Sequence, residues 1–303
     1  MIRAYSENKM CAKRWYATAA LCFAMMLSLH TPRATAQSSE SEEKGMILTE
    51  HFGASSSTDG KVFSFSSAAG YNFNKYFGVD VGIPVYIVRA PSSVRGARSS
   101  NGIGDLFVDL RLSLDNRWFG YSATLTGTAP SGDTSKGRST GRATFDLDNH
   151  FDRSVGHFTP FADIDLGNTV NQRVYRRPYL TLGKVASFEA GTSVKFFRSV
   201  SASASLYDVA PWGTQRVFSR FIPRGTTVLG AVQHNRVYEK SAETLGGASL
   251  DRDNGVNVGV SYSPTRYLDF GVGYSRSMHY SLNTVSFGIG VNLSSLIGRA
   301  NGW

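Results

Sequence analysis

Apolar and polar residues alternate with a period of two along many stretches of this chain. In residues 76–87, one face carries Phe77, Val79, Val81, Ile83, Val85 and Ile87, and the other carries Gly78, Asp80, Gly82, Pro84 and Tyr86. A period of two is typical of a β-strand with two unlike faces. The stretches run to about 9 to 11 residues, the length at which a tilted strand crosses a lipid bilayer.

These stretches predict an all-β fold, an antiparallel transmembrane β-barrel of about 12 strands. An even number of strands is what bacterial single-chain barrels have. The expected strands are 46–56, 61–73, 76–87, 103–114, 117–128, 142–151, 157–168, 178–196, 199–208, 255–264, 267–276 and 282–293. A soluble β-sandwich also alternates, but its outer faces are not apolar along their length.

The connections between the expected strands support the barrel. Short turns follow the second, fourth, sixth, eighth and tenth strands. Polar or glycine-rich segments follow the third, fifth, seventh and ninth strands, at 88–102, 129–141, 169–177 and 209–254. Membrane barrels pair short periplasmic turns with long external loops in this way. We therefore expect 209–254 to be a long external loop.

The first 36 residues have the zones of a secretory signal peptide. Basic residues precede an apolar run from Trp15 to Leu29, and Ala34-Thr35-Ala36 follows. This pattern predicts cleavage after Ala36 and export in a Gram-negative bacterium. Residues 37–45 would form a short periplasmic segment, 46–293 the barrel, and 294–303 a C-terminal tail. Both cysteines, Cys11 and Cys22, lie in the leader, so cysteine chemistry is excluded from the mature part.

The charge of the chain argues against a nucleic-acid-binding protein. Residues 1–36 hold five Lys or Arg and one Glu, so their removal lowers the formal charge from +9 to +5. The remaining basic residues are scattered through polar loops instead of clustered with aromatics. Nine basic residues lie in or beside the external loops, and we expect them to contact anionic outer-membrane lipid. They are Arg89, Arg95, Arg98, Lys136, Arg138, Arg142, Arg173, Arg176 and Arg177.

Several glycine-rich segments resemble an outer-membrane family described as meta-pathway phenol-degradation proteins. They are Gly102-Ile103-Gly104-Asp105-Leu106, residues 129–137 and 139–141, and Phe158-Thr159-Pro160-Phe161. The resemblance implies a barrel of the transporter or channel type that passes small, often aromatic, compounds. Many such barrels end in a strand that closes on an aromatic residue, whereas alternation here stops near Leu293.

The polar faces of the expected strands collect charged residues. If the apolar faces meet lipid, the lumen is lined by Asp80, Asp105, Asp109, Arg111, Asp146, Asp148, His150, Asp163, Asp165 and Glu189. Buried ionic groups are costly unless they are paired or in contact with water. The set indicates either an acidic stripe that favours cations along an aqueous path or a structural charge network that fills a small barrel.

A lipid-modifying hydrolase is an alternative reading. Barrel lipid hydrolases carry His-x-Ser-Asn, and this chain has His279-Tyr280-Ser281-Leu282-Asn283, in which Leu282 displaces the asparagine. A hairpin turn explains these residues equally well. His51, His150, His157 and His234 are dispersed, so we expect no metal and no cofactor.

The leading hypothesis is a porin-like channel or transporter for small molecules, with the lumen aspartates and Arg111 setting selectivity. The other hypotheses are the hydrolase using Ser281 and His279, and a structural or adhesive barrel whose loop 209–254 binds a partner. The expected partners are outer-membrane lipids, a small-molecule solute and the outer-membrane assembly machinery, but no nucleic acid.

Overall fold

The computed structural model of the chain describes residues 44–116, 118–170, 177–228, 234–265 and 268–292. The expected signal peptide, nearly all of the segment 37–45 and the tail 294–303 lie outside the described residues. No helix in the described ranges is long and apolar enough to cross a membrane.

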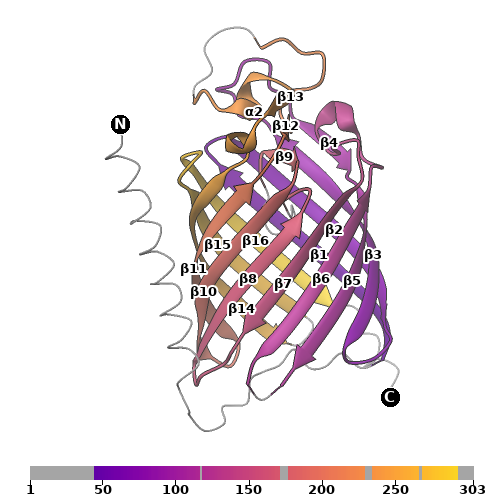
Figure 1. Cartoon of the computed structure of the whole chain (residues 1–303), viewed down its shortest axis with the longest axis vertical. Helices are drawn as coiled ribbons and strands as arrows, with labels where there is room; N and C mark the ends of the chain where they lie inside the picture. Colours follow the sequence, from indigo (N-terminus) through magenta and orange to yellow (C-terminus); the bar gives the residue numbers. More distant parts are fainter. Residues whose placement is uncertain (1–43, 117, 171–176, 229–233, 266–267, 293–303) are drawn as a thin grey trace, which may run out of the picture. The chain divides into compact units, whose positions relative to one another are not determined.

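Twelve antiparallel strands close into a barrel (Figure 1), which confirms the predicted fold. Each strand pairs with the next one around the wall. The barrel closes where β16 pairs with β1, from Thr49 opposite Asn292 to Ser57 opposite Thr284. The wall consists of β1 (Gly45–Ser57), β2 (Gly60–Asn72), β3 (Phe77–Arg89), β5 (Leu106–Asp115), β6 (Gly120–Ala129), β7 (Thr144–Asp152), β8 (Phe158–Gly167), β10 (Val185–Phe197), β11 (Val200–Pro211), β14 (Asp253–Thr265), β15 (Leu268–Ser277) and β16 (Leu282–Asn292).

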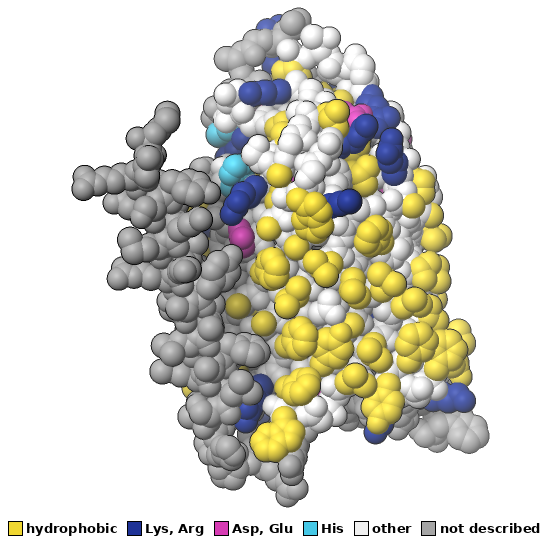
Figure 2. All heavy atoms as spheres, viewed as in Figure 1, with side chains coloured by type: hydrophobic (Ala, Val, Ile, Leu, Met, Phe, Trp, Pro, Cys, Tyr) yellow, Lys and Arg dark blue, Asp and Glu magenta, His cyan; other side chains and the backbone are white. Residues whose placement is uncertain are grey.

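The two faces of the wall separate as the alternation predicts. The odd-numbered residues of β3 from Phe77 to Ile87 are largely exposed, whereas Tyr86 and Val88 on the other face are buried. Large apolar side chains cover the outer surface on the face seen in Figure 2, with basic residues gathered toward one end. A surface of this kind is stable only against lipid, so the strands cross a bilayer.

The loops differ in length between the two ends of the barrel. At one end the turns are short, at 73–76, 116–119, 153–157 and 198–199; at the other lie the connections 90–99, 130–143, 168–178 and 212–252. We call these the short-turn end and the mouth. By the general rule for bacterial barrels, the mouth faces outward.

Two expected strands are interrupted in the structure. The stretch 103–114 divides into β4 (Ser100–Ile103) and β5 at Gly104-Asp105, and 178–196 divides into β9 (Tyr179–Leu182) and β10 at Gly183-Lys184. The single strand predicted over 178–196 is therefore wrong. Its first part leaves the wall because β9 pairs with β12 instead.

The long connection between β11 and β14 is folded. We call residues 212–252, apart from 229–233, the lid. It contains β12 (Gln215–Ser219), α2 (Val237–Lys240), β13 (Glu243–Gly246) and the short 3-10 helix η2 (Ala248–Leu250). Strands β13, β12 and β9 form a second, three-stranded sheet at the mouth (Figure 1). A further 3-10 turn, η1 (Thr134–Lys136), lies in the connection 130–143.

Candidate functional site

The predicted lumen residues share the inner face of the wall. Asp80 lies opposite Asp109, Asp148 opposite Asp165, and Asp163 opposite Glu189. Arg111, Asp146 and His150 occupy the same parity on β5 and β7. Asp105 instead lies in the break between β4 and β5, at the mouth. Apart from Asp105, the structure thus brings this set together from five strands, β3, β5, β7, β8 and β10, with β6 lying between β5 and β7.

Near the short-turn end, the charged side chains form ion pairs that reach water. The Nε atom of Arg111 lies 2.5 Å from Oδ2 of Asp80, and Nη2 donates to Asn72 at 2.9 Å. His150 Nδ1 lies 2.5 Å from Asp163. The side chains of Arg111 and His150 are 31% and 38% exposed. Charged and titratable groups with this exposure indicate that the part of the lumen near the short-turn end, which we call the lower lumen, is aqueous.

Hydroxyl groups and an amide satisfy other acidic residues of the lumen, Asp109, Asp165 and Glu189. Thr126 donates to Asp109 at 2.7 Å, and Ser187 donates to Asp165 at 2.5 Å. Glu189 accepts hydrogen bonds from Ser205 and from the amide of Asn257. These partners come from adjacent strands, and sequence reasoning missed them because it followed charge alone. The carboxylates of Asp109, Asp165 and Glu189 are thereby held in fixed positions.

A pocket of about 90 Å³ lies at the mouth, between the wall and the loops. One side is apolar or aromatic, and threonine hydroxyls line another. Its residues are Pro84, Tyr86, Asp105, Phe107, Thr126, Thr128, Arg138, Thr140, Thr144, Asp146, Thr169, Val170, Leu180 and Arg220. In contrast to the lower lumen, its charged residues are nearly inaccessible: Arg138, Asp146 and Arg220 are 5%, 3% and 3% exposed.

The lid is hydrogen-bonded to three other connections of the mouth. The amide of Arg98 donates to the carbonyl of Phe221, the amide of Arg224 to Ser135, and the amide of Arg220 to Pro178. Phe221 itself is buried with Val62, Tyr86 and Val88 of the barrel wall. Residues 219–224 therefore reach into the mouth, and the lid covers the lumen instead of extending into solvent.

A second set of contacts fastens the lid to the turn between β1 and β2. Asp59, which is buried, accepts hydrogen bonds from Arg236 and from the hydroxyl of Tyr238. Arg236 also donates to the carbonyl of Ser281 at 3.0 Å. The ring of Tyr238 stacks on Tyr179 at 4.8 Å between centroids. Burial raises the pKa of Tyr238, so its hydroxyl remains a donor. We call this set the Asp59 latch.

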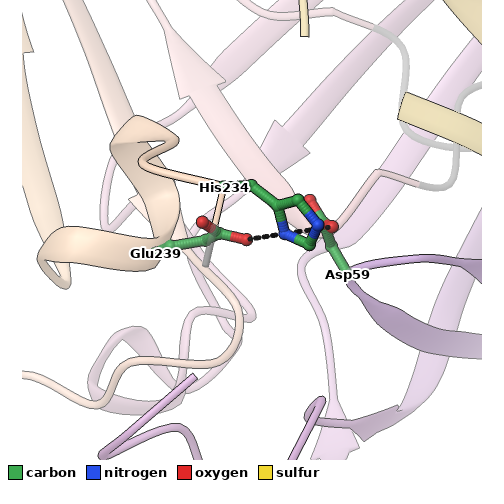
Figure 3. Close-up of side chains that lie close together, drawn as sticks. All are labelled: Asp59, His234 and Glu239. Atoms are coloured by element: carbon green, nitrogen blue, oxygen red, sulfur yellow. Dashed lines mark hydrogen bonds and ion pairs between the residues drawn. The ribbon is translucent and has the colours of Figure 1, made fainter. Parts of the chain in front are cut away.

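His234 and Glu239 lie beside the latch and point toward Asp59 (Figure 3). The His234 Nδ1 atom is 3.5 Å from Asp59 and 3.2 Å from Glu239. One ligand atom from each residue falls within 4.8 Å of the others. A histidine with two carboxylates is a donor set that divalent cations use. In the sequence, His234 stands apart from the other histidines. The sequence pattern did not predict this cluster, because Asp59 is far from His234 in the sequence. Arg236 already occupies one oxygen of Asp59.

The residues of the alternative hydrolase lie in and beside the turn between β15 and β16. His279 and Ser281 are exposed, and Ser281 has a φ of 50°. Within the described ranges no hydrogen bond joins them. Asn283 accepts hydrogen bonds from Tyr274 at 2.9 Å and Arg276 at 2.6 Å, on the outer face of the wall. The three side chains therefore form no relay.

Two of the loop cations expected to contact lipid are buried. Arg138 lines the mouth pocket, and Arg177, 7% exposed, pairs with Asp253 at 3.3 Å. For these two the expectation of lipid contact is wrong, because the external connections pack on one another. Arg142 is exposed as expected, and Arg173 and Arg176 lie outside the described residues.

The fold and the lumen define a closed transmembrane β-barrel. No family model matches this chain, and no curated protein matches it. Among solved structures it is similar to the COG4313 outer membrane channel from Pseudomonas putida F1, with 11% identity and a TM-score of 0.53, over 86% of this chain and 100% of that one. The KdgM porin, solved in complex with disordered oligogalacturonate, has 9% identity and a TM-score of 0.45, over 80% and 98%. At such identities the likeness to the first of them shows the fold.

Proposed function

We propose that this protein is a channel of the bacterial outer membrane that passes small molecules. The observation that carries the proposal is the wet, charged lower lumen inside a barrel whose outer surface is apolar. Arg111 and His150 keep about a third of their side-chain surface in contact with water although they lie within the wall. A barrel that served only as an anchor has no need of such a lining.

The expected export signal and the matching barrel of a solved outer membrane channel support the location. The lumen carboxylates at Asp80, Asp109, Asp146, Asp148, Asp163, Asp165 and Glu189, with Arg111, set the charge selectivity in this proposal. The lid constrains the mouth. Small hydrophobic or aromatic compounds are the solutes that the resemblance in the glycine-rich segments implies.

Planar-bilayer recording on refolded protein tests the proposal. Discrete conductance steps are expected because water and ions follow the lower lumen. Uniform absence of conductance in several salts, from a preparation whose folded state is verified by heat-dependent gel migration, would contradict a channel. An unrelated barrel refolded in the same detergent serves as the control for leakage.

A further inference from the structure

Two arginines of the mouth pocket are buried with unfilled hydrogen-bonding capacity. Arg138 is 5% exposed and Arg220 is 3% exposed. Within the described residues, Nε and Nη2 of Arg138 and Nε and Nη1 of Arg220 have no hydrogen-bond partner. A guanidinium presents five N–H donors in a fixed plane and stays charged at any ordinary pH. Buried donors of this strength require an acceptor.

The surrounding backbone holds both side chains in place. The guanidinium of Arg138 lies so close to Gly102 that a Cβ atom there would overlap it. The guanidinium of Arg220 lies over the ring of Tyr86, 4.4 Å from its centroid. Gly137 packs directly on the carbonyl of Ser219, which brings the two connections that carry the arginines together. The arginines are therefore positioned before any ligand arrives.

The charges around the pocket leave the loop side positive. Asp105 accepts a hydrogen bond from the amide of Gly132 at 2.9 Å, and burial raises its pKa, although the Gly132 hydrogen bond and the nearby Arg220 oppose that shift. Burial lowers the pKa of Arg138 and of Arg220, yet from a value so high that both remain cationic. Asp133, outside the pocket, weakly favours the charged form of Arg138. Two cations thus face one carboxylate on this side.

Most of the accessible lining of the pocket is apolar. Phe107, Val170 and Leu180 are buried there, at 4%, 2% and 6% exposure. The volume of about 90 Å³ is several times the roughly 10–15 Å³ that one water needs. Asp146 and Thr126, Thr128 and Thr144 of the wall, with Thr140 and Thr169 of the connections, offer hydrogen-bond acceptors to a ligand.

We propose that this pocket binds a small organic carboxylate with a compact apolar body, with the carboxylate on Arg138 and Arg220. Planar bidentate recognition by arginine suits a carboxylate, and the apolar wall suits the rest of the molecule. The inference deepens the proposed channel function, on which it rests, by naming the class of solute that stops at the mouth.

Isothermal titration of the refolded barrel with benzoate tests the inference. Benzamide, which has the same shape without the charge, and sulfate, which has charge without the apolar body, are the comparison ligands. Charge-assisted hydrogen bonds are expected to make benzoate bind at least about tenfold more tightly than either. Equal affinity for benzoate and benzamide would overturn the carboxylate site, and tighter binding of sulfate would show a simple anion site instead.

Substitutions locate the binding. Arg138→Gln and Arg220→Gln are each expected to weaken benzoate binding about tenfold or more, while Arg142→Gln, at an exposed arginine of the same connection, leaves it unchanged. Arg138→Lys and Arg220→Lys keep the charge, and they replace any glutamine variant that fails to fold. They are expected to weaken binding by a smaller factor. Wild-type affinity in all four variants would overturn the assignment.

Conductance measured on the same preparations separates the two proposals. A barrel that conducts ions but does not bind benzoate retains the channel function and loses the carboxylate site. A barrel that binds benzoate through the two arginines but never conducts retains the site and loses the channel function.

Discussion

The two halves of the lumen are built on the same strands but differ in their contact with water. Near the short turns, Arg111 pairs with Asp80 and His150 pairs with Asp163, and these side chains stay partly exposed. Near the mouth, Asp146, Arg138 and Arg220 are all at most 5% exposed. Both halves are built from the same strands, and the connections that fold over the mouth bury the residues there. In the proposed channel the barrel supplies the path, and the loops control access to it.

Removal of the lid is expected to have the largest effect. Replacing residues 212–252 by a short glycine-serine linker leaves the ladder between β11 and β14 intact, from Val200 opposite Tyr262 to Val209 opposite Asp253. Single-channel conductance should then rise several-fold, because residues 219–224 no longer fill the mouth. Two glycines inserted at the short turn 198–199 serve as the control. Unchanged conductance after lid removal would mean that the mouth is not the constriction.

Breaking the Asp59 latch comes next. Asp59→Asn removes the carboxylate that Arg236 and Tyr238 contact, and leaves a guanidinium with 8% side-chain exposure without its ion-pair partner. Losing one partner of a buried ion pair costs about 3 kcal/mol. Proteolysis of the lid should accelerate and brief high-conductance openings should appear. Glu243→Gln, which breaks the partly exposed pairs with Arg216 and Arg224, should cost about 0–1 kcal/mol and leave gating unaltered.

The strands were predictable from sequence, whereas the closure of the mouth was not. Period-two alternation depends on neighbours within one strand, so the inward face of Asp80 and Asp163 could be assigned directly. The alternation also continued through Gly183-Lys184, where β9 leaves the wall. That break depends on pairing between Thr181 and Val217, which are far apart in the chain. Local pattern carries no information on such contacts.

The candidate site divides in the same way. The lumen carboxylates were identified by parity, but their hydroxyl partners Thr126, Ser187 and Ser205 depend on the register between strands. Arg138 was expected to meet lipid because loop cations usually lie at the surface. Its burial results from packing between two connections, which no spacing in the sequence signals.

A pH-dependent stability of the lid is expected from Asp251. Burial raises the pKa of this carboxyl to about 7 from 3.8, against the opposing charge of Arg177. Between pH 3.8 and about 7 the folded lid therefore binds a proton that the unfolded lid releases. The stability of the lid falls as the pH rises through this range and stays low above it. At 1.36 kcal/mol per pKa unit the shift corresponds to an upper limit of roughly 4 kcal/mol, and relaxation around the buried carboxyl reduces the change to on the order of 2 kcal/mol. The measurement is the protection of the lid from a protease as a function of pH.

Asp251→Asn should flatten this profile and protect the lid at neutral pH. Asp133→Asn, at an exposed carboxylate of the connection 130–143, should leave the slope in place. A slope that survives Asp251→Asn would assign the proton to another group.

The smallest effect is expected in the lower lumen. Arg111→Gln removes the cation that pairs with Asp80, and both side chains are partly exposed, so the stability cost is about 1 kcal/mol. The reversal potential in a potassium chloride gradient should shift toward stronger cation preference. Lys61→Gln, an exposed residue of β2, should not shift it. A shift toward anions with Arg111→Gln would contradict an aqueous path past Asp80.

The contrast between the two halves is tested most directly by cysteine accessibility along one strand. Residues 37–303 contain no cysteine. Thr144, 8% exposed in the mouth pocket, and His150, whose side chain is 38% exposed, lie on the same face of β7. A charged thiol reagent should modify His150→Cys rapidly and Thr144→Cys slowly, and lid removal should make the second fast. Equal rates in the intact barrel would contradict a wet lower lumen beneath a closed mouth.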